Sequence, residues 1–259
     1  MKRASIIIVS IAAVMIVIGG ILSIVSLAQG AKYYGIFNIG WRELETKSYS
    51  DFDTINKINV DIDLASVKVK TGDDFKVVIN SNTKQTFTVE ESNGTLIIIE
   101  ESKDKWNYWN IGIGNSKTTI DLYIPAEYQL EDVTIESDAA SIDISQLLAK
   151  SVTLEVDAGK IDVSNINTEY LSVRVNAGKV DIEGKVDGDI NIQCDVGAIV
   201  LLLEGDELDY QVNGSVDVGS FKFNNNSYGG VLNSDFNFGT GRNKIDVDCA
   251  AGSVKIKVN

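Results

Sequence analysis

The chain has 259 residues and a hydrophobic content of 44%, which is enough to build one hydrophobic core. Its formal net charge of −14 argues against binding to nucleic acid, which requires a basic surface. The sequence has no histidine, so it lacks the commonest general base and the commonest metal ligand.

Residues 4–28 form an uncharged run that is rich in Ile and Val. The run is longer than the roughly 20 residues that a helix needs to span a bilayer. Two basic residues precede it and indicate a cytoplasmic N-terminus, with the remainder of the chain outside. We therefore predict one N-terminal transmembrane helix in the membrane lipid at residues 1–28, followed by a juxtamembrane linker at 29–56. A cleaved signal sequence is the alternative, because Ser26-Leu27-Ala28 fits a cleavage site.

An extracytoplasmic β-repeat domain is predicted at residues 57–259. Apolar and polar residues alternate from Ile58 to Val69, which is typical of β-strands. Ser92-Asn93-Gly94 separates two further apolar stretches and predicts a β-hairpin. Asp63-Leu64-Ala65-Ser66 resembles Asp138-Ala139-Ala140-Ser141, which belongs to the regular repeats later in the chain. This similarity predicts an early copy of the repeat.

Residues 103–117 are polar and glycine-rich but contain Trp106, Tyr108 and Trp109. We predict a loop or a loosely paired hairpin. Aromatic side chains in a loop can stack on sugar rings or anchor in a membrane interface. The alternative is that they cap the open end of the β stack. The strand predicted next, at Thr119 to Ile124, ends at Pro125.

The most regular part of the chain is a repeat with a fixed period. Four units begin at Val133, Val152, Leu171 and Ile190, each 19 residues after the one before. Each unit has an alternating strand, a turn with small residues and a second alternating strand. A period near this length indicates stacked β units. The predicted fold is therefore all-β, a β-solenoid-like stack, with these structural turn glycines: Gly159, Gly178, Gly197, Gly219 and Gly252.

The pattern becomes less regular after residue 203. Asn224-Asn225-Asn226 with Gly229-Gly230 predicts a longer loop, and residues 235–241 predict a degenerate unit. Residues 244–258 restore the motif. Within the last regular unit, Val200 and Leu202 break the outward polar pattern. They are predicted either as an exposed apolar contact site for a protein or as residues that the C-terminal loop covers.

Cys194 and Cys249 occupy equivalent inward positions of their units. If the units stack in chain order, the unit of Gly219 separates them by two steps of about 4.8 Å. The resulting distance of about 10 Å exceeds the limit for a disulfide. We therefore predict two buried free thiols.

Two rows of acidic residues follow from the period. One lies in the turns (Asp138, Asp157, Asn176, Asp195 and Asp217) and one on a strand (Asp143, Asp162 and Asp181). Three explanations remain open for the turn and strand rows. The turn carboxylates can accept backbone N–H groups of their own turn, Lys160 and Lys179 can neutralise the strand row, or calcium can bind between units. The glycine-rich calcium repeat is missing, and no cofactor is predicted.

The apolar N-terminal segment and three further features resemble the bacterial putative-adhesin β-strand-repeat family. These features are the stretch INVDIDLASVKVKTGDDFKVVI, the junction DLYIPAEYQLEDVTIES and the units DAGKIDV and NAGKVDI. The family is a domain of unknown function that is similar in shape to the toast-rack domains of cell-envelope stress proteins. Over residues 57–259 the resemblance implies a β-solenoid-like surface domain with a role in adhesion or envelope stress. It implies no catalytic residues.

No phosphate-binding glycine loop, Cys-x-x-Cys pair or nucleophile elbow is present in the sequence, and most carboxylates belong to the periodic rows. We therefore predict that the protein is not an enzyme. The predicted function is that of a single-pass bacterial membrane protein with an extracytoplasmic β domain. It would act in envelope-stress response or regulation through contacts with an envelope protein. The alternative is an adhesin that binds an external surface or glycan through Trp106, Tyr108 and Trp109.

Overall fold

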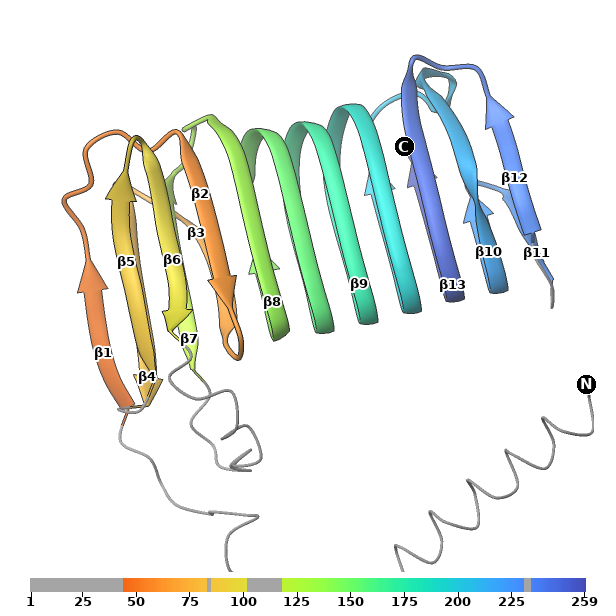
Figure 1. Ribbon diagram of the computed structural model, residues 1–259. Coiled ribbons are helices and arrows are strands. Elements are labelled where there is room, and N and C mark those ends of the chain that lie inside the picture. Colours follow the sequence, from red (N-terminus) through yellow and green to blue (C-terminus); the bar gives the residue numbers. More distant parts are fainter. Residues whose placement is uncertain (1–43, 83–84, 102–117, 231–233) are drawn as a thin grey trace, which may run out of the picture. The chain divides into compact units, whose positions relative to one another are not determined.

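The computed structural model describes residues 44–82, 85–101, 118–230 and 234–259. These residues form one thirteen-stranded sheet (Figure 1), and the predicted all-β class is correct. The first seven strands are β1 (Leu44–Tyr49), β2 (Lys57–Ile62), β3 (Ser66–Gly72), β4 (Lys76–Asn82), β5 (Thr86–Ser92), β6 (Thr95–Glu101) and β7 (Thr119–Pro125). They are followed by β8 (Leu130–Ile144), β9 (Leu147–Leu203), the short 3-10 helix η1 (Glu207–Asp209), β10 (Tyr210–Phe223), β11 (Asn226–Gly230), β12 (Ser234–Gly239) and β13 (Asn243–Val258).

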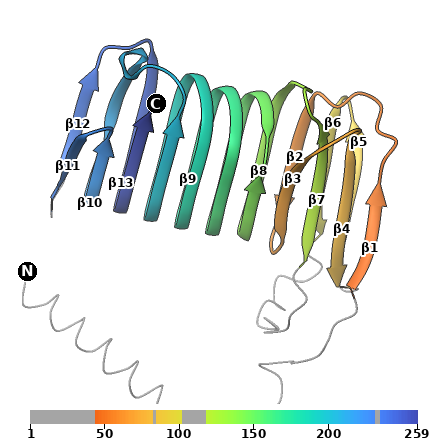
Figure 2. The ribbon, with the colours of Figure 1, turned by 180° about the vertical axis from the view of Figure 1, so that it is seen from behind.

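Strands β8 and β9 form the wound part of the sheet. β8 pairs in parallel with the start of β9, with Val133 opposite Val152 and Ile142 opposite Ile161. β9 continues as a single strand of 57 residues that winds through successive coils (Figures 1 and 2). The inward residues of each coil are buried, for example Leu154 at 0% exposure. The predicted 19-residue stack is therefore confirmed.

The segments predicted as turns are bends within a continuous ladder. Ala139 pairs with Ala158 and Ala140 with Gly159, so the chain bends without leaving the sheet. A Cβ atom at Gly178 would lie 2.1 Å from the carbonyl oxygen of Gly159, and one at Gly197 would lie 2.2 Å from that of Gly178. Real Cβ atoms essentially never approach other atoms within 3.0 Å. The bends need glycine because the backbone of the preceding coil occupies the space of a side chain.

An unusual backbone angle is a second reason for glycine at Gly219, whose φ is 143°. Gly178 and Gly197 have no positive φ. The other three glycines approach the adjacent backbone in the same way. A Cβ at Gly159 would lie 1.8 Å from the nearest carbonyl oxygen. The same distance would be 1.7 Å at Gly219 and 2.0 Å at Gly252.

The sheet begins before residue 57. β2 and β3 stack in parallel on β8, with Ile58 opposite Val133 and Val67 opposite Ile142, which confirms the early copy of the repeat. β5 and β6 form the predicted hairpin. β7 lies between β3 and β4, and β4 also pairs with β1. Since β1 falls within residues 29–56, part of the predicted linker belongs to the sheet.

At the other end the strands do not stack in chain order. β13 lies between β9 and β10, with Ile245 opposite both Ile190 of β9 and Val212 of β10 (Figure 2). The prediction that the unit of Gly219 follows directly on β9 is therefore wrong. The position of Cys249 relative to Cys194 changes with it, and the two residues are direct neighbours across the ladder.

The strands after β10 close this end of the stack. The predicted longer loop is a hairpin in which β11 returns antiparallel to β10 directly after Asn224 and Asn225. The predicted degenerate unit is β12, which also pairs antiparallel with β10. Phe236 of β12 stacks on Phe221 of β10 with ring centroids 3.9 Å apart. These aromatic contacts cover the open end of the core, which explains why the last strands depart from the repeat.

The predicted membrane segment at residues 1–28 lies outside the described residues. Within the described part of the chain, no helix has the length and hydrophobicity to cross a membrane.

Candidate functional site

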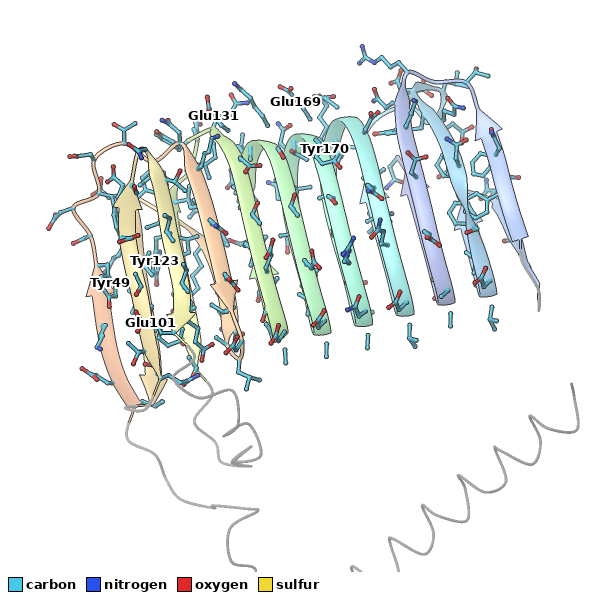
Figure 3. The ribbon with its side chains drawn as sticks, viewed as in Figure 1. Tyr49, Glu101, Tyr123, Glu131, Glu169 and Tyr170 are labelled. Carbon is cyan, nitrogen blue, oxygen red and sulfur yellow. The ribbon has the colours of Figure 1, made fainter. Side chains whose placement is uncertain are left out.

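Trp106, Tyr108 and Trp109 lie outside the residues that the structure describes. The candidate surfaces are therefore the two outer faces of the wound sheet, on which side chains stand at regular intervals along each coil (Figure 3). In each repeat unit, the outward residues before the bend lie on one face. The outward residues after the bend lie on the other face.

The face before the bends holds a row of three carboxylates. Glu136 lies between Asp61 and Glu155 on adjacent parallel strands. Partial desolvation on the sheet raises the pKa of Glu136, and the like charges of Glu155 and Asp61 raise it further. Arg174 ends the row, with its Nη1 3.5 Å from Glu155 Oε1, and its Nε donates to Gln193 Oε1 at 2.9 Å. The row is a site of charge repulsion with one compensating cation at its end.

A raised pKa means that the folded state favours the protonated form of Glu136. This group therefore lowers stability as pH rises above its ordinary value of 4.5. We expect Glu136→Gln to raise the melting temperature at pH 7, with the difference disappearing near pH 3.5. Thermal unfolding at both pH values measures this. Glu169→Gln, at the edge of the coils in Figure 3, is the matched control. An equal gain from both variants at pH 7 would contradict the repulsion at Glu136.

The face after the bends carries the strand row of aspartates. Lys179 Nζ lies 2.6 Å from Asp181 Oδ2, and Lys160 forms the same pair with Asp162. The interleaved lysines therefore neutralise part of this row, which was one of the predicted alternatives. Among the described residues, no group of three or more Cys, Asp and Glu side chains is placed to hold a metal ion.

The turn row makes contacts between coils. Asn176 Nδ2 donates to Asp157 Oδ1 at 2.6 Å. The hydrogen bond that the structure gives Asp157 thus comes from the next coil and not from the backbone of its own turn, which was one of the predicted alternatives. This bond joins adjacent coils at the bend.

Val200 and Leu202 lie on the same face, further along the stack, and are half-buried. In the ladder, Val200 is opposite Lys255 of β13 and Leu202 is opposite Lys257. Lys222 of β10 is in turn opposite Lys255. A neighbouring strand of the sheet, and not a loop, therefore flanks the two apolar residues.

We call these five residues the lysine–apolar patch: Val200, Leu202, Lys222, Lys255 and Lys257. The three lysines are exposed, and none of them forms a salt bridge with another described residue. One unit earlier in the sequence, the equivalents of Val200 and Leu202 are Asp181 and Glu183. The charge on this face therefore changes from negative to positive across the apolar pair.

Sequence reasoning identified the apolar pair of this patch but not its lysines. Lys255 is 55 residues from Val200 along the chain, and the two meet only because β13 is inserted beside β9. No local pattern carries that information. The alternating polar positions of β13 indicated only that its lysines face outward.

Residues 55–187, more than half of the chain, match the family described as Toastrack DUF4097. No curated protein matches the chain in sequence. Among solved structures, it is similar to a "putative cell adhesion protein" from Clostridium sporogenes, with 12% identity, a TM-score of 0.45 and coverage of 84% of this chain and 100% of that one.

Two further solved structures show similar coverage. A "putative adhesin" from Bacteroides fragilis has 14% identity and a TM-score of 0.35, covering 83% of this chain and 97% of that one. A "putative lipid binding protein" from Parabacteroides distasonis has 14% identity and a TM-score of 0.37, covering 83% and 96%. On the extent of the family match, the chain belongs to the Toastrack DUF4097 family, as the resemblance in its sequence indicated.

Proposed function

We propose that the protein is a membrane-anchored, non-enzymatic surface module of a bacterium that acts in envelope-stress response or regulation through protein contacts. The observation that supports this most is the lysine–apolar patch. Three exposed lysines without salt bridges among the described residues lie on one side of a half-buried apolar pair, in a chain whose net charge is −14. A partner with acidic side chains around an apolar residue would complement this surface.

The wound sheet supports a binding role over a catalytic one. Its outward side chains recur with the repeat, and Asp162, Asp181 and Asp157 of its acidic rows already form ion pairs or a contact between coils. A regular, continuously paired sheet presents such side chains at fixed intervals. It therefore suits the recognition of another surface.

The test is the survival of a deletion strain under membrane- and cell-wall-targeting antibiotics. We expect a change in sensitivity that the full-length protein restores and that K222E/K255E/K257E does not restore. The control variant is K57E/K76E/K150E, which reverses three exposed lysines that form no salt bridge among the described residues. Both triple variants change the net charge from −14 to −20, so only the location of the charges differs.

Equal surface levels and equal melting temperatures of the two triple variants would exclude a folding defect. If the deletion strain has unchanged sensitivity, the stress role is wrong. Binding of the protein to glycans and external surfaces, with and without alanine at Trp106, Tyr108 and Trp109, then tests the adhesin alternative. If both triple variants restore the phenotype, the patch is not the contact surface.

A further inference from the structure

The two cysteines of the chain are brought together by the insertion of β13. Cys249 of β13 is directly opposite Cys194 of β9 in the parallel ladder. Both are free thiols and buried, with exposed fractions of 3% for Cys194 and 0% for Cys249. They are neighbours in one inward row, so their side chains point into the core on the same side of the sheet.

The distance between these two strands is compatible with a covalent bond. Paired strands lie about 4.8 Å apart. The Cα atoms of disulfide-bonded cysteines are usually about 4.4–6.8 Å apart, a range that includes this spacing. Their Cβ atoms lie somewhat closer together than the Cβ atoms of two residues that are directly opposite on parallel strands. A small approach of β13 towards β9 is therefore needed. The two thiols are close enough in the docked state for each to shift the pKa of the other.

We propose that Cys194 and Cys249 form an intrachain disulfide, by thiol–disulfide exchange with a disulfide-bearing oxidant, as β13 docks between β9 and β10. The bond would join strands whose cysteines are 55 residues apart in the chain. It would enclose β10, β11 and β12 in one covalent loop. A loop of this length removes considerable freedom from the unfolded chain.

The exchange proceeds in two steps. The Cys194 thiolate attacks one sulfur of the oxidant, which forms a mixed disulfide and releases one thiolate of the oxidant. The Cys249 thiolate then attacks the sulfur of Cys194 and displaces the second thiolate. Two protein thiols and one oxidant disulfide thus become one protein disulfide and two oxidant thiols. Two electrons pass from the cysteine pair to the oxidant.

Burial determines when the reaction can take place. In the docked state, desolvation raises the pKa of Cys194 and outweighs the lowering influence of the neighbouring Cys249. Desolvation, together with the neighbouring Cys194, raises the pKa of Cys249 to about 12. Thiolates are therefore scarce in the docked state. The bond must form while β13 is still partly open, and the folded reduced protein should react slowly with thiol reagents.

The test is refolding of the full-length chain in detergent with either oxidised glutathione or a reductant. With oxidised glutathione we expect a mass decrease of about 2 Da, a cross-linked peptide joining Cys194 to Cys249, and a melting temperature higher by about 5–10 °C. The control is C194V/C249V, whose melting temperature should be the same under both conditions. Valine suits this position because Val175 and Val216 are buried in the same row.

Two outcomes would overturn the proposal. One is a refolded product that keeps two alkylatable thiols in the presence of oxidised glutathione. The other is a product that carries glutathione on both cysteines without the cross-link. The experiment needs neither a cellular location nor a binding partner, so its result is independent of the proposed function.

Discussion

Gly178→Val is expected to lower the free energy of unfolding by at least about 3 kcal/mol. The added Cβ would lie 2.1 Å from the carbonyl oxygen of Gly159, with the carbonyl carbon and the amide nitrogen of the same residue at 3.0 and 3.2 Å. All three are backbone atoms, and they belong to a coil that is packed on both sides. The new side chain therefore cannot be accommodated by a rotamer change and must separate two coils.

The matched control for this prediction is Lys179→Val, one residue further along. Lys179 is exposed and its contact is an ion pair with Asp181 at 2.6 Å. Exposed pairs of this kind contribute about 0–1 kcal/mol, and valine is favoured in strands. Denaturant unfolding of both variants measures the difference, and Gly178→Ala isolates the effect of the Cβ alone. Equal destabilisation at the two positions would refute the backbone contact as the reason for glycine.

Ending the chain after Arg242 is expected to unfold the part of the sheet around β10 while the stack from β2 to β8 persists. The truncation removes β13, whose inward residues are buried (Ile245, Val247, Cys249, Val254 and Ile256). At about 1.5–3 kcal/mol for each large apolar side chain, their loss amounts to about 10 kcal/mol. That is comparable with the whole stability of a typical domain, about 5–15 kcal/mol.

Amide hydrogen exchange would locate this effect. We expect lost protection in β10 and in the last coil of β9, because both pair with β13, and retained protection in β2 and β8. Stacked repeats contact mainly their neighbours, so the loss should not spread far. Ending the chain after Val258 is the control and should leave protection in β10 unchanged. Loss of protection throughout the sheet would mean that the stack unfolds as one unit.

The repeat made the centre of the fold predictable, because identical patterns stack on themselves. Val133, Val152 and Leu171 each begin an apolar strand of the same length, so the register between them follows from the spacing alone. The structural glycines were also found in this way, although the close approach of the adjacent backbone at each of them is visible only in the structure. Local periodicity was sufficient wherever neighbours in the sequence are neighbours in the sheet.

The order of strands beyond β9 could not be predicted, because β10 and β13 carry the same inward pattern. Val212 and Ile245 are both suitable partners for Ile190 by hydrophobicity. The two strands differ in their aromatic residues. β10 carries Phe221, which stacks on Phe236 of β12, and this aromatic cover is needed at the outer end of the core. The cysteine pair and the lysines of the lysine–apolar patch depend on this order, so only the apolar pair of the patch was predicted.

The position of β13 also has a consequence for biosynthesis. Ribosomes make β10, β11 and β12 before β13, and yet β13 lies between β9 and β10 in the finished sheet. The coils of β8 and β9 can add one after another as the chain emerges. At β9 this sequential growth must pause, because its next partner has not been made. The edges of β9 and β10 stay open until then, and an open edge is a template for wrong pairing. The stack is thus completed when β13 inserts between β9 and β10, which have both been made before it.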